Sequence, residues 1–288
     1  MSISRKKGCV PYQSENTSIV VPSTNSNAQP RFHILFESEA TLVIDKQPGV
    51  LTQAPMGVDS VETRVKDFLN RREGRIGKRY LGPPHRLDRP ASGVLMFAKT
   101  PQAARFLSAQ FEERSVSKKY WALVAGRVPE DMGRWIDYMR KIPGRAEAEL
   151  VPPINPDARE AILRFEVLER LADATLLEIQ LDTGRTHQIR LQCSSRGFPI
   201  LGDELYGSTV PFGERYEDER ERAIALHARE LTFVDFQADE KTTVQAPLYR
   251  PWKTWLDLPD EEFLDEMFLK PEPVTTDVYG LCERKSNR

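Results

Sequence analysis

Hydrophobic and polar residues alternate along several short stretches of the chain, and this period of two is typical of half-buried strands. The pattern is clear in KKYWALVAGRV at 118–128, where Tyr120, Ala122 and Val124 would face one side of a sheet. The run GVLMFAK at 93–99 is apolar almost throughout, which predicts a strand buried on both faces. Further strands are predicted at 32–38, 41–49, 133–141, 145–151, 159–170, 174–182 and 225–236.

A helical period occurs in three places. Residues 59–72 carry Asp59 with Glu62 three positions later, a capping pair ahead of apolar residues at helical spacing. A second helix is predicted to begin at Thr100-Pro101, and a third spans 186–197 and ends at a glycine. Because strands outnumber helices and do not alternate with them one for one, we expect an α+β fold with a mixed, mostly antiparallel sheet and flanking helices.

Composition suggests a division of the chain into three parts. Residues 1–30 are rich in Ser, Asn, Thr, Gln and Pro and predict a disordered leader, 31–258 a folded domain, and 259–288 an acidic and polar tail. The charged run at 213–223 is expected to be a loosely attached insert.

Charge and apolar content exclude some classes of protein. The 288 residues hold 41 Lys and Arg against 43 Asp and Glu, so net charge does not indicate a nucleic-acid binder, although a local basic patch still could. No apolar run approaches the roughly 20 residues of a spanning helix, and no apolar signal segment follows the N-terminal Arg and Lys residues. We therefore expect a soluble, cytoplasmic protein. Cys9, Cys193 and Cys282 lie too far apart in sequence to indicate a disulfide framework or a zinc site.

Three segments carry unusual chemistry. In the first, HRLDRPASG at 85–93, two arginines and a histidine surround Asp88, and a turn-rich stretch follows that could expose the carboxylate at the mouth of a cleft. The second, SKKYW at 117–121, joins two lysines to an aromatic residue. In the third, DTGRTHQIR at 182–190, Gly184 allows a tight turn between a strand and a helix.

These segments resemble the RluA-type family of RNA pseudouridine synthases. HRLDRPASGVLMFAKT resembles the family's catalytic aspartate motif, and SVSKKYWALVAGRV resembles the segment with its active-site tyrosine. The other family motifs follow in the family's order as VIDKQPGVLT, TGRTHQIR, GFPILGDELYG and ALHARELTF. The resemblance covers roughly residues 32–256. It implies the pseudouridine synthase fold with a central active-site cleft, and makes 31–258 the catalytic domain.

The resemblance also implies the reaction: a uridine in RNA is detached from carbon 1′ of its ribose, rotated, and rejoined through carbon 5. Asp88 would assist cleavage of the glycosidic bond, either by attacking the sugar or by removing a sugar proton, and Arg185 would be the cation that keeps it ionised. Tyr120 would stack on the displaced base and accept or relay the carbon-5 proton. The reaction requires no metal or redox cofactor.

RNA is the expected partner, ribosomal or transfer, and the protein is expected to be a monomer with no obligatory protein partner. Cations near the catalytic residues in sequence are the first phosphate candidates, namely Arg86, Arg89, Lys118 and Lys119. The basic run at 71–80 is a further candidate. Leu87 and Leu177 are candidates for apolar walls that exclude water.

One departure from the family pattern affects the loop after the aspartate. Where the family has an acidic residue and a threonine after the second arginine, this chain has Pro90 and Ala91, so the hydrogen bonding of the loop is expected to differ.

Other functions are weighed against this one. LDTG at 181–184 is similar to the aspartic protease motif, but Arg185 stands where those enzymes keep a small residue, and no second D-T-G exists in the chain. HRLD is similar to the kinase catalytic loop, but no Gly-rich loop or D-F-G accompanies it. An RNA-binding or RNA-folding protein of the same fold, without catalysis, remains the alternative.

Overall fold

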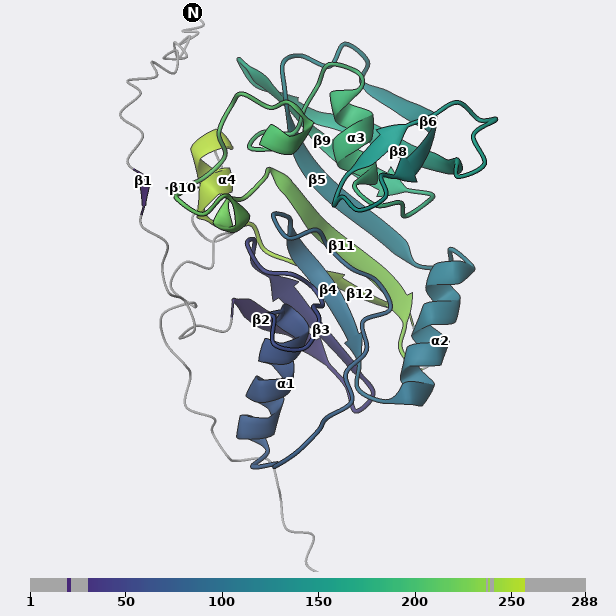
Figure 1. Ribbon diagram of the computed structural model, residues 1–288, viewed down its shortest axis with the longest axis vertical. Helices are drawn as coiled ribbons and strands as arrows, with labels where there is room; N and C mark the ends of the chain where they lie inside the picture. The colour runs from purple at the N-terminus through teal and green to yellow at the C-terminus, as the bar shows by residue number, and fades with distance from the viewer. Residues whose placement is uncertain (1–19, 22–30, 237, 239–240, 257–288) are drawn as a thin grey trace, which may run out of the picture.

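A mixed ten-stranded sheet forms the centre of the protein (Figure 1). The structure is a computed structural model that describes residues 20–21, 31–236, 238 and 241–256. The strand order is β2-β3-β4-β11-β5-β9-β8-β6-β7, with β12 paired to β11 outside this path. Within this sheet only the β4–β11 pair is parallel, which confirms the predicted mixed, mostly antiparallel α+β fold. The strands span Phe32–Glu37 (β2), Thr41–Lys46 (β3), Ser92–Ala98 (β4), Ser117–Ala125 (β5), Met132–Lys141 (β6), Ala148–Leu150 (β7), Arg159–Arg170 (β8), Ala174–Leu181 (β9), Leu226–Val234 (β11) and Lys241–Gln245 (β12).

The register across the centre of the sheet sets which residues share a face. Gly93 on β4 pairs with Ala228 on β11, Ala228 with Tyr120 on β5, and Tyr120 in turn with Ile179 on β9. Directly opposed residues lie on the same face of a sheet. The residues just before β4 therefore reach the neighbourhood of Tyr120, although about 30 positions separate them in sequence.

A glycine permits the close approach of β4 and β11. Gly93 has a φ of +107°, and a Cβ at this position would lie 2.3 Å from the Ala228 carbonyl oxygen. Glycine alone combines this backbone conformation with the absence of a side chain. The parallel pairing of these two strands thus depends on this one residue.

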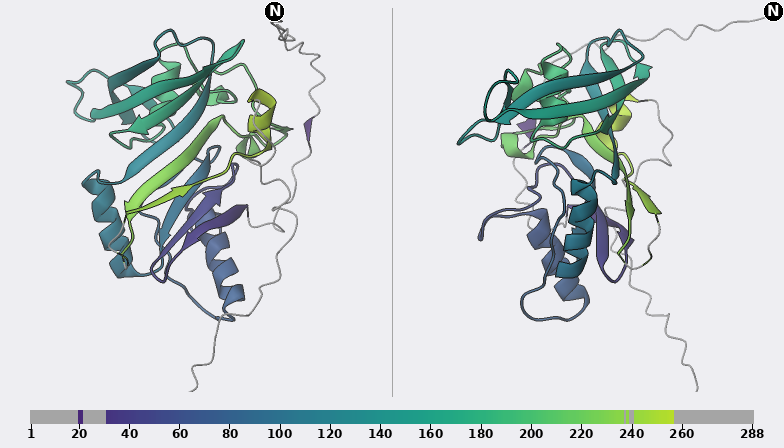
Figure 2. Two further views of the ribbon diagram at one scale, coloured as in Figure 1. Left: turned by 180° about the vertical axis from the view of Figure 1, so that it is seen from behind. Right: turned by 90° about the vertical axis from the view of Figure 1, so that its right-hand side faces the viewer.

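Helices cover the sheet by narrow apolar stripes. Helix α1 (Val61–Arg72) buries Val61, Val65 and Leu69, and α2 (Pro101–Glu112) buries Ala103 and Leu107. Figure 2 shows the two helices near the same end of the sheet, away from α3 (Gln188–Ser194) and its neighbouring strands. A short fourth helix, α4 (Arg250–Trp255), places the fully buried Trp252 in the main core.

The structure corrects the predicted start of α1. The N-cap is Ser60, whose hydroxyl accepts the Thr63 backbone N–H, whereas Asp59 forms an ion pair with Arg64 instead. The prediction failed because both residues are good cap formers and neighbour each other in sequence. The start of α2 is confirmed, since Thr100 caps it and Pro101 follows.

The charged insert is more ordered than expected. It contains β10 (Arg215–Tyr216), which pairs in parallel with β1 (Val20–Val21) from the predicted disordered leader. A 3-10 helix at Glu219–Glu221 follows, and Glu221 lies 3.7 Å from the guanidinium of Arg31. The remaining leader residues and the predicted tail at 259–288 lie outside the described residues.

Candidate active site

Two side chains fix the backbone of the loop that carries Asp88. Lys46, the last residue of β3, is fully buried, and its ammonium donates to the carbonyl oxygens of Asp88, Arg89 and Ala91 at 3.2, 3.1 and 2.7 Å. Thr52 clamps the adjacent peptide, because its hydroxyl accepts the Leu87 N–H at 3.1 Å and donates to the Leu87 carbonyl at 2.9 Å. Burial lowers the pKa of Lys46 to about 7, which the carboxylates of Asp88 and Asp45 partly oppose. The loop is therefore held from beneath by a buried lysine.

The Asp88 carboxylate lies beside a cation from α3 and an imidazole from the turn before it. Arg190 Nη1 lies 3.4 Å from Asp88 Oδ2, and His187 Nε2 lies 3.7 Å from Oδ1. Arg190 is itself held by Asp203, which accepts Nε and Nη2 in a two-point contact at 2.7 Å each. Its guanidinium also lies 5.0 Å from the centre of the Tyr206 ring. Burial acts to lower the pKa of Arg190, but Asp203 and Asp88 together raise it above its ordinary value. The guanidinium is therefore a permanent cation here.

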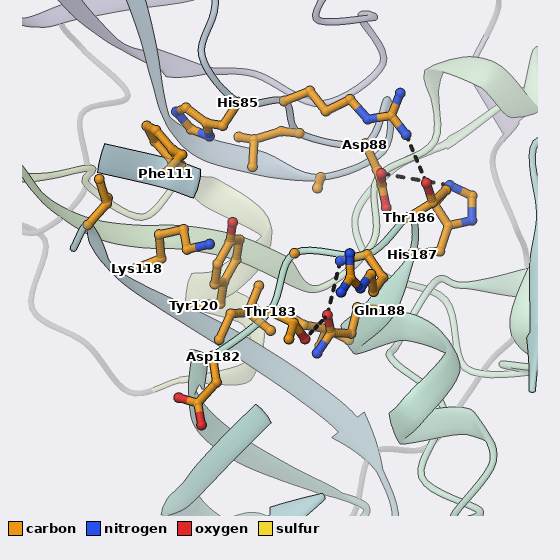
Figure 3. Close-up of a pocket in the computed structure, with 18 of the residues that line it drawn as sticks. His85, Asp88, Phe111, Lys118, Tyr120, Asp182, Thr183, Thr186, His187 and Gln188 are labelled. Atoms are coloured by element: carbon orange, nitrogen blue, oxygen red, sulfur yellow. Dashed lines mark hydrogen bonds and ion pairs between the residues drawn. The ribbon is translucent and has the colours of Figure 1, made fainter. Parts of the chain in front are cut away.

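A network of amide side chains shapes the turn that leads into α3. The Gln188 side-chain oxygen accepts the Thr183 hydroxyl at 2.8 Å and the Arg185 backbone N–H at 3.0 Å. His187 takes a left-handed conformation with φ of 53°, and its Nδ1 lies 3.0 Å from the Tyr206 hydroxyl. The helix begins two residues later than the predicted 186, since this turn occupies residues 183–187. The turn directs His187 toward Asp88 (Figure 3), and Arg190 on α3 contacts the same carboxylate.

Tyr120 projects from β5 into the same space. Only 8% of the residue is exposed. Burial raises the pKa of the Tyr120 hydroxyl above its ordinary value, and the negative charge of Asp88 raises it further. The phenol consequently keeps its proton at neutral pH. Figure 3 shows its ring between Lys118 on one side and the Asp182–Gln188 turn on the other.

A cavity of about 450 Å³ joins these groups. This volume exceeds that of a pyrimidine and lies within the range of small-molecule sites. His187 lies at the Asp88 end, and His85, Phe111 and Lys118 lie at the other end (Figure 3). The lining includes His85, Arg86, Leu87, Asp88, Ala91, Phe111, Lys118, Tyr120, Leu181, Arg185, His187, Ile189 and Leu226.

The structure brings some of the predicted site residues together and not others. Asp88, Tyr120, Arg185, Arg86, Leu87 and Lys118 line the cavity. Arg89 and Lys119 do not, and Leu177 is fully buried in the core instead. The strand period explains Lys119, which lies on the face of β5 opposite Tyr120, with its ammonium 3.4 Å from Glu178 and 3.8 Å from Glu230.

The cation beside Asp88 also differs from the expected one. The resemblance assigned this place to Arg185, but that side chain is exposed and its Nε donates to the Glu160 carbonyl at 2.9 Å. Arg190 contacts the Asp88 carboxylate instead. It lies in the first turn of α3, and Asp203 fixes the orientation of its guanidinium. The arginines on either side of Asp88 in sequence do not pair with it either, since Arg86 donates to the Thr186 hydroxyl at 2.9 Å.

Four residues of this site were not singled out from the sequence: Lys46, His187 as a neighbour of Asp88, Arg190 and Asp203. Each lies in a motif that carried the resemblance, so position in a motif was a signal available for all of them. Their partners, however, lie 13 to 102 positions away, and no local spacing indicates such contacts.

The described residues contain no group of three or more His, Cys, Asp or Glu side chains able to hold a metal ion. Cys193 is buried, and burial raises the pKa of its thiol to about 12, so it is no nucleophile. Among the same residues, no helix is long and apolar enough to cross a membrane.

A family model described as RNA pseudouridylate synthase matches residues 40–195, which include the Asp88 loop, Tyr120 and the turn into α3. The chain belongs to this family. The match confirms the RluA-type resemblance and identifies the protein as an RNA pseudouridine synthase.

Named relatives match the synthase over most of its length. It is 33% identical over 239 residues to a ribosomal large subunit pseudouridine synthase C from Vibrio cholerae, covering 79% of this chain and 70% of the relative. It is 32% identical to a ribosomal large subunit pseudouridine synthase D from Xanthomonas campestris, covering 80% of this chain and 70% of the relative.

Two solved human structures share the fold of the synthase. RNA pseudouridylate synthase domain containing 4 aligns with a TM-score of 0.61 at 23% identity, covering 75% of this chain and 88% of that one. RNA pseudouridylate synthase domain containing 1 aligns with a TM-score of 0.58 at 25% identity, covering 75% and 83%. The predicted pseudouridine synthase fold is thereby confirmed.

Proposed function

We propose that this synthase converts a uridine of large-subunit ribosomal RNA to pseudouridine, with Asp88 and Tyr120 as its catalytic residues. One observation carries the proposal: Asp88, which a buried arginine contacts, and Tyr120 line a single cavity of about 450 Å³. The names of the relatives from Vibrio cholerae and Xanthomonas campestris, both ribosomal large subunit pseudouridine synthases, support the choice of ribosomal over transfer RNA.

Asp88 acts on the sugar. Its carboxylate is partly exposed to the cavity, and the nearest donor among the described residues is Arg190 Nη1 at 3.4 Å. Oxygen lone pairs are therefore free to face carbon 1′ or the proton on carbon 2′. The Arg190 guanidinium, itself held by Asp203, contacts only Oδ2 of the Asp88 carboxylate. Direct attack gives a covalent sugar ester, and proton removal gives an unsaturated sugar; both release the base.

Tyr120 acts on the base. Its buried ring offers a flat face for stacking, and its protonated hydroxyl offers a hydrogen bond to the freed uracil. The proton on carbon 5 is lost only after the new carbon–carbon bond has formed, when the hydroxyl oxygen is placed to relay it. Leu181, Ile189 and Leu226 on the cavity walls exclude water and protect the intermediate.

The uridine enters the cavity as a flipped-out nucleotide. Extrusion costs a few kcal/mol, which contacts to the flanking backbone can offset. Arg86 and Arg185 are exposed at the cavity and serve as phosphate contacts in this proposal. The cavity holds only the flipped uridine, so it cannot distinguish one uridine of the RNA from another. Contacts between the protein surface and the surrounding RNA therefore select the target uridine.

The test measures tritium release from RNA labelled at carbon 5 of uracil. Wild-type protein is expected to release tritium from a large-subunit ribosomal RNA transcript and not from transfer RNA, and Asp88→Asn is expected to release none while melting at the wild-type temperature. Release by Asp88→Asn would contradict the assignment of the catalytic residue. Release from transfer RNA alone would contradict the substrate, and binding without release from any RNA would favour a non-catalytic RNA-binding role.

A further inference from the structure

We propose that Lys118 stabilises the negative charge that forms on uracil when the glycosidic bond breaks, and that it is therefore a catalytic residue rather than a phosphate contact. This inference rests on the proposed function above. It assigns a distinct task to the end of the cavity that lies away from Asp88.

The geometry places the Lys118 ammonium inside the cavity. Lys118 and Tyr120 are two positions apart on β5, so their side chains leave the same face of the sheet. The ammonium lies 5.8 Å from the centre of the Phe111 ring, and a Cβ on Gly184 across the cavity would lie 3.7 Å from Nζ. Figure 3 shows the ammonium directed toward the Tyr120 side chain.

Lys118 lacks a carboxylate partner. Among the described residues, no carboxylate oxygen lies within 4.0 Å of its Nζ, although Lys119 beside it has two such partners. The His85 ring, which stacks on Phe111, carries no charge, because its Nε2 accepts the Met96 backbone N–H and burial lowers its pKa to about 3. An ammonium that is part-buried and unpaired is costly to the folded protein. Burial, and then the charge of Arg114, lower its pKa from the ordinary value.

The position of this cation matches the separation of charge in the reaction. When the bond between carbon 1′ and N1 breaks, the electron pair leaves with the base, and uracil becomes an anion whose charge spreads over N1, O2 and O4. The sugar is left electron-poor next to the Asp88 carboxylate. Tyr120 lies between Lys118 and the Asp88 carboxylate (Figure 3). The carbonyl edge of a base stacked on the tyrosine can therefore accept a hydrogen bond from the Lys118 ammonium.

The step balances without any further reactant. Lys118 keeps its proton and only donates a hydrogen bond, which strengthens as charge develops on the base. After the base rotates and carbon 5 bonds to carbon 1′, the carbon-5 proton leaves and N1 regains a proton. The charge on uracil is then gone, and the contact weakens again.

A phosphate contact is the competing role for Lys118. Phosphates of the flanking backbone remain near solvent, where Arg86, Arg114 and Arg185 are exposed at the cavity. Lys118 is less exposed than all three and sits beside the group on which the base stacks. The base therefore accounts for its position better than the backbone does.

Lys118→Met tests the proposal in a single-turnover assay with saturating enzyme and the tritiated ribosomal RNA transcript. The rate is expected to fall about 10²–10³-fold, as for the loss of one donor to a developing anion. RNA affinity in a filter-binding assay is expected to stay within about threefold, with an unchanged salt dependence. Lys118→Arg should recover at least a tenth of the wild-type rate. The melting temperature of Lys118→Met should not fall, because the methionine replaces an unpaired, part-buried charge.

The matched control is Lys119→Met, on the same strand but on the opposite face, which is expected to keep the wild-type rate. A second substrate carrying 5-fluorouridine at the target position separates the chemistry further. Fluorine withdraws electrons and stabilises the uracil anion, so the Lys118→Met defect in forming the rearranged fluorinated nucleoside should be at least tenfold smaller than with uridine.

Three results would overturn the inference. An unchanged single-turnover rate with weakened binding and a salt slope reduced by about one would make Lys118 a phosphate contact. A rate loss equal for both bases, or a lower melting temperature that accounts for the loss, would make its role structural. A wild-type protein that releases no tritium would instead refute the proposed function. That outcome is read from the comparison of wild type with Asp88→Asn, which does not involve Lys118.

Discussion

Replacing Lys46 by methionine removes the support beneath the Asp88 loop while nearly keeping the length of the side chain. The ammonium donates to the carbonyl oxygens of Asp88, Arg89 and Ala91, and also to that of Gln47 at 3.1 Å. Asp88 and Arg89 each retain a second partner, since their carbonyls also accept the N–H groups of Ala91 and Gly49. The Ala91 carbonyl has the shortest of these bonds, at 2.7 Å, and is the group most exposed to the loss.

The magnitude follows from this inventory. A buried carbonyl left without a donor costs about 1–3 kcal/mol, and each of two carbonyls that keep one partner loses about 0.5–1.5 kcal/mol. The fourth carbonyl, that of Gln47, belongs to a partly exposed residue, where water can replace the lost donor. Removing the buried ammonium also removes its desolvation cost, which is large enough to lower the pKa of Lys46 to about 7. We expect Lys46→Met to lower the free energy of unfolding by about 2–4 kcal/mol. A shift of about 1 Å in the Asp88 loop should lower the single-turnover rate about 100-fold.

Urea unfolding followed by tryptophan fluorescence measures the first quantity, and tritium release at a temperature where the variant is folded measures the second. Lys66→Met is the control, because Lys66 is a surface residue of α1 that pairs with Glu62 one turn away, a contact of only about 0.3–0.5 kcal/mol. If Lys46→Met unfolds at the wild-type urea concentration and turns over at the wild-type rate, the claim that this lysine holds the loop is refuted.

Three further outcomes are expected. Gly93→Ala should destabilise the protein by about 3 kcal/mol or more, because its Cβ would meet the Ala228 carbonyl in a left-handed backbone; an unchanged melting temperature would contradict this. His85 has a folded pKa lowered by burial to about 3, below its unfolded value of 6.5, so the unfolded state binds more protons between these values and stability falls as the pH falls from 6.5 toward 3. His85→Gln should remove about 1.4 kcal/mol per pH unit of that slope between pH 6 and 4, measured by urea unfolding, and parallel curves would argue against it. Arg190→Lys should lower the free energy of unfolding by about 2–4 kcal/mol and reduce turnover, since lysine cannot make the two-point contact with Asp203; wild-type stability of this variant would exclude that contact as a support.

The sequence determined the fold class and the family, and it pointed to two residues that line the cavity, Asp88 and Tyr120. The strand period at 118–128 placed Tyr120 on a single face of β5. The order of motifs identified the family and made Asp88 the predicted catalytic residue before any geometry was known. Local chemistry sufficed in these cases because alternation, capping and turn formation depend on neighbours a few positions apart. The start of α2 at Thr100-Pro101 was correct for the same reason.

Tertiary structure alone decided which cation serves the carboxylate. In the sequence, Arg86 and Arg89 are nearest to Asp88, and the family resemblance pointed to Arg185, yet Arg190 arrives from 102 positions away. Its place depends on the Asp203 contact, the left-handed His187 and the strand register through Gly93, none of which has a local signature. Electrostatic partnership in a folded protein is set by distance in space, and the long-range pairing of β4, β11 and β5 fixes that distance.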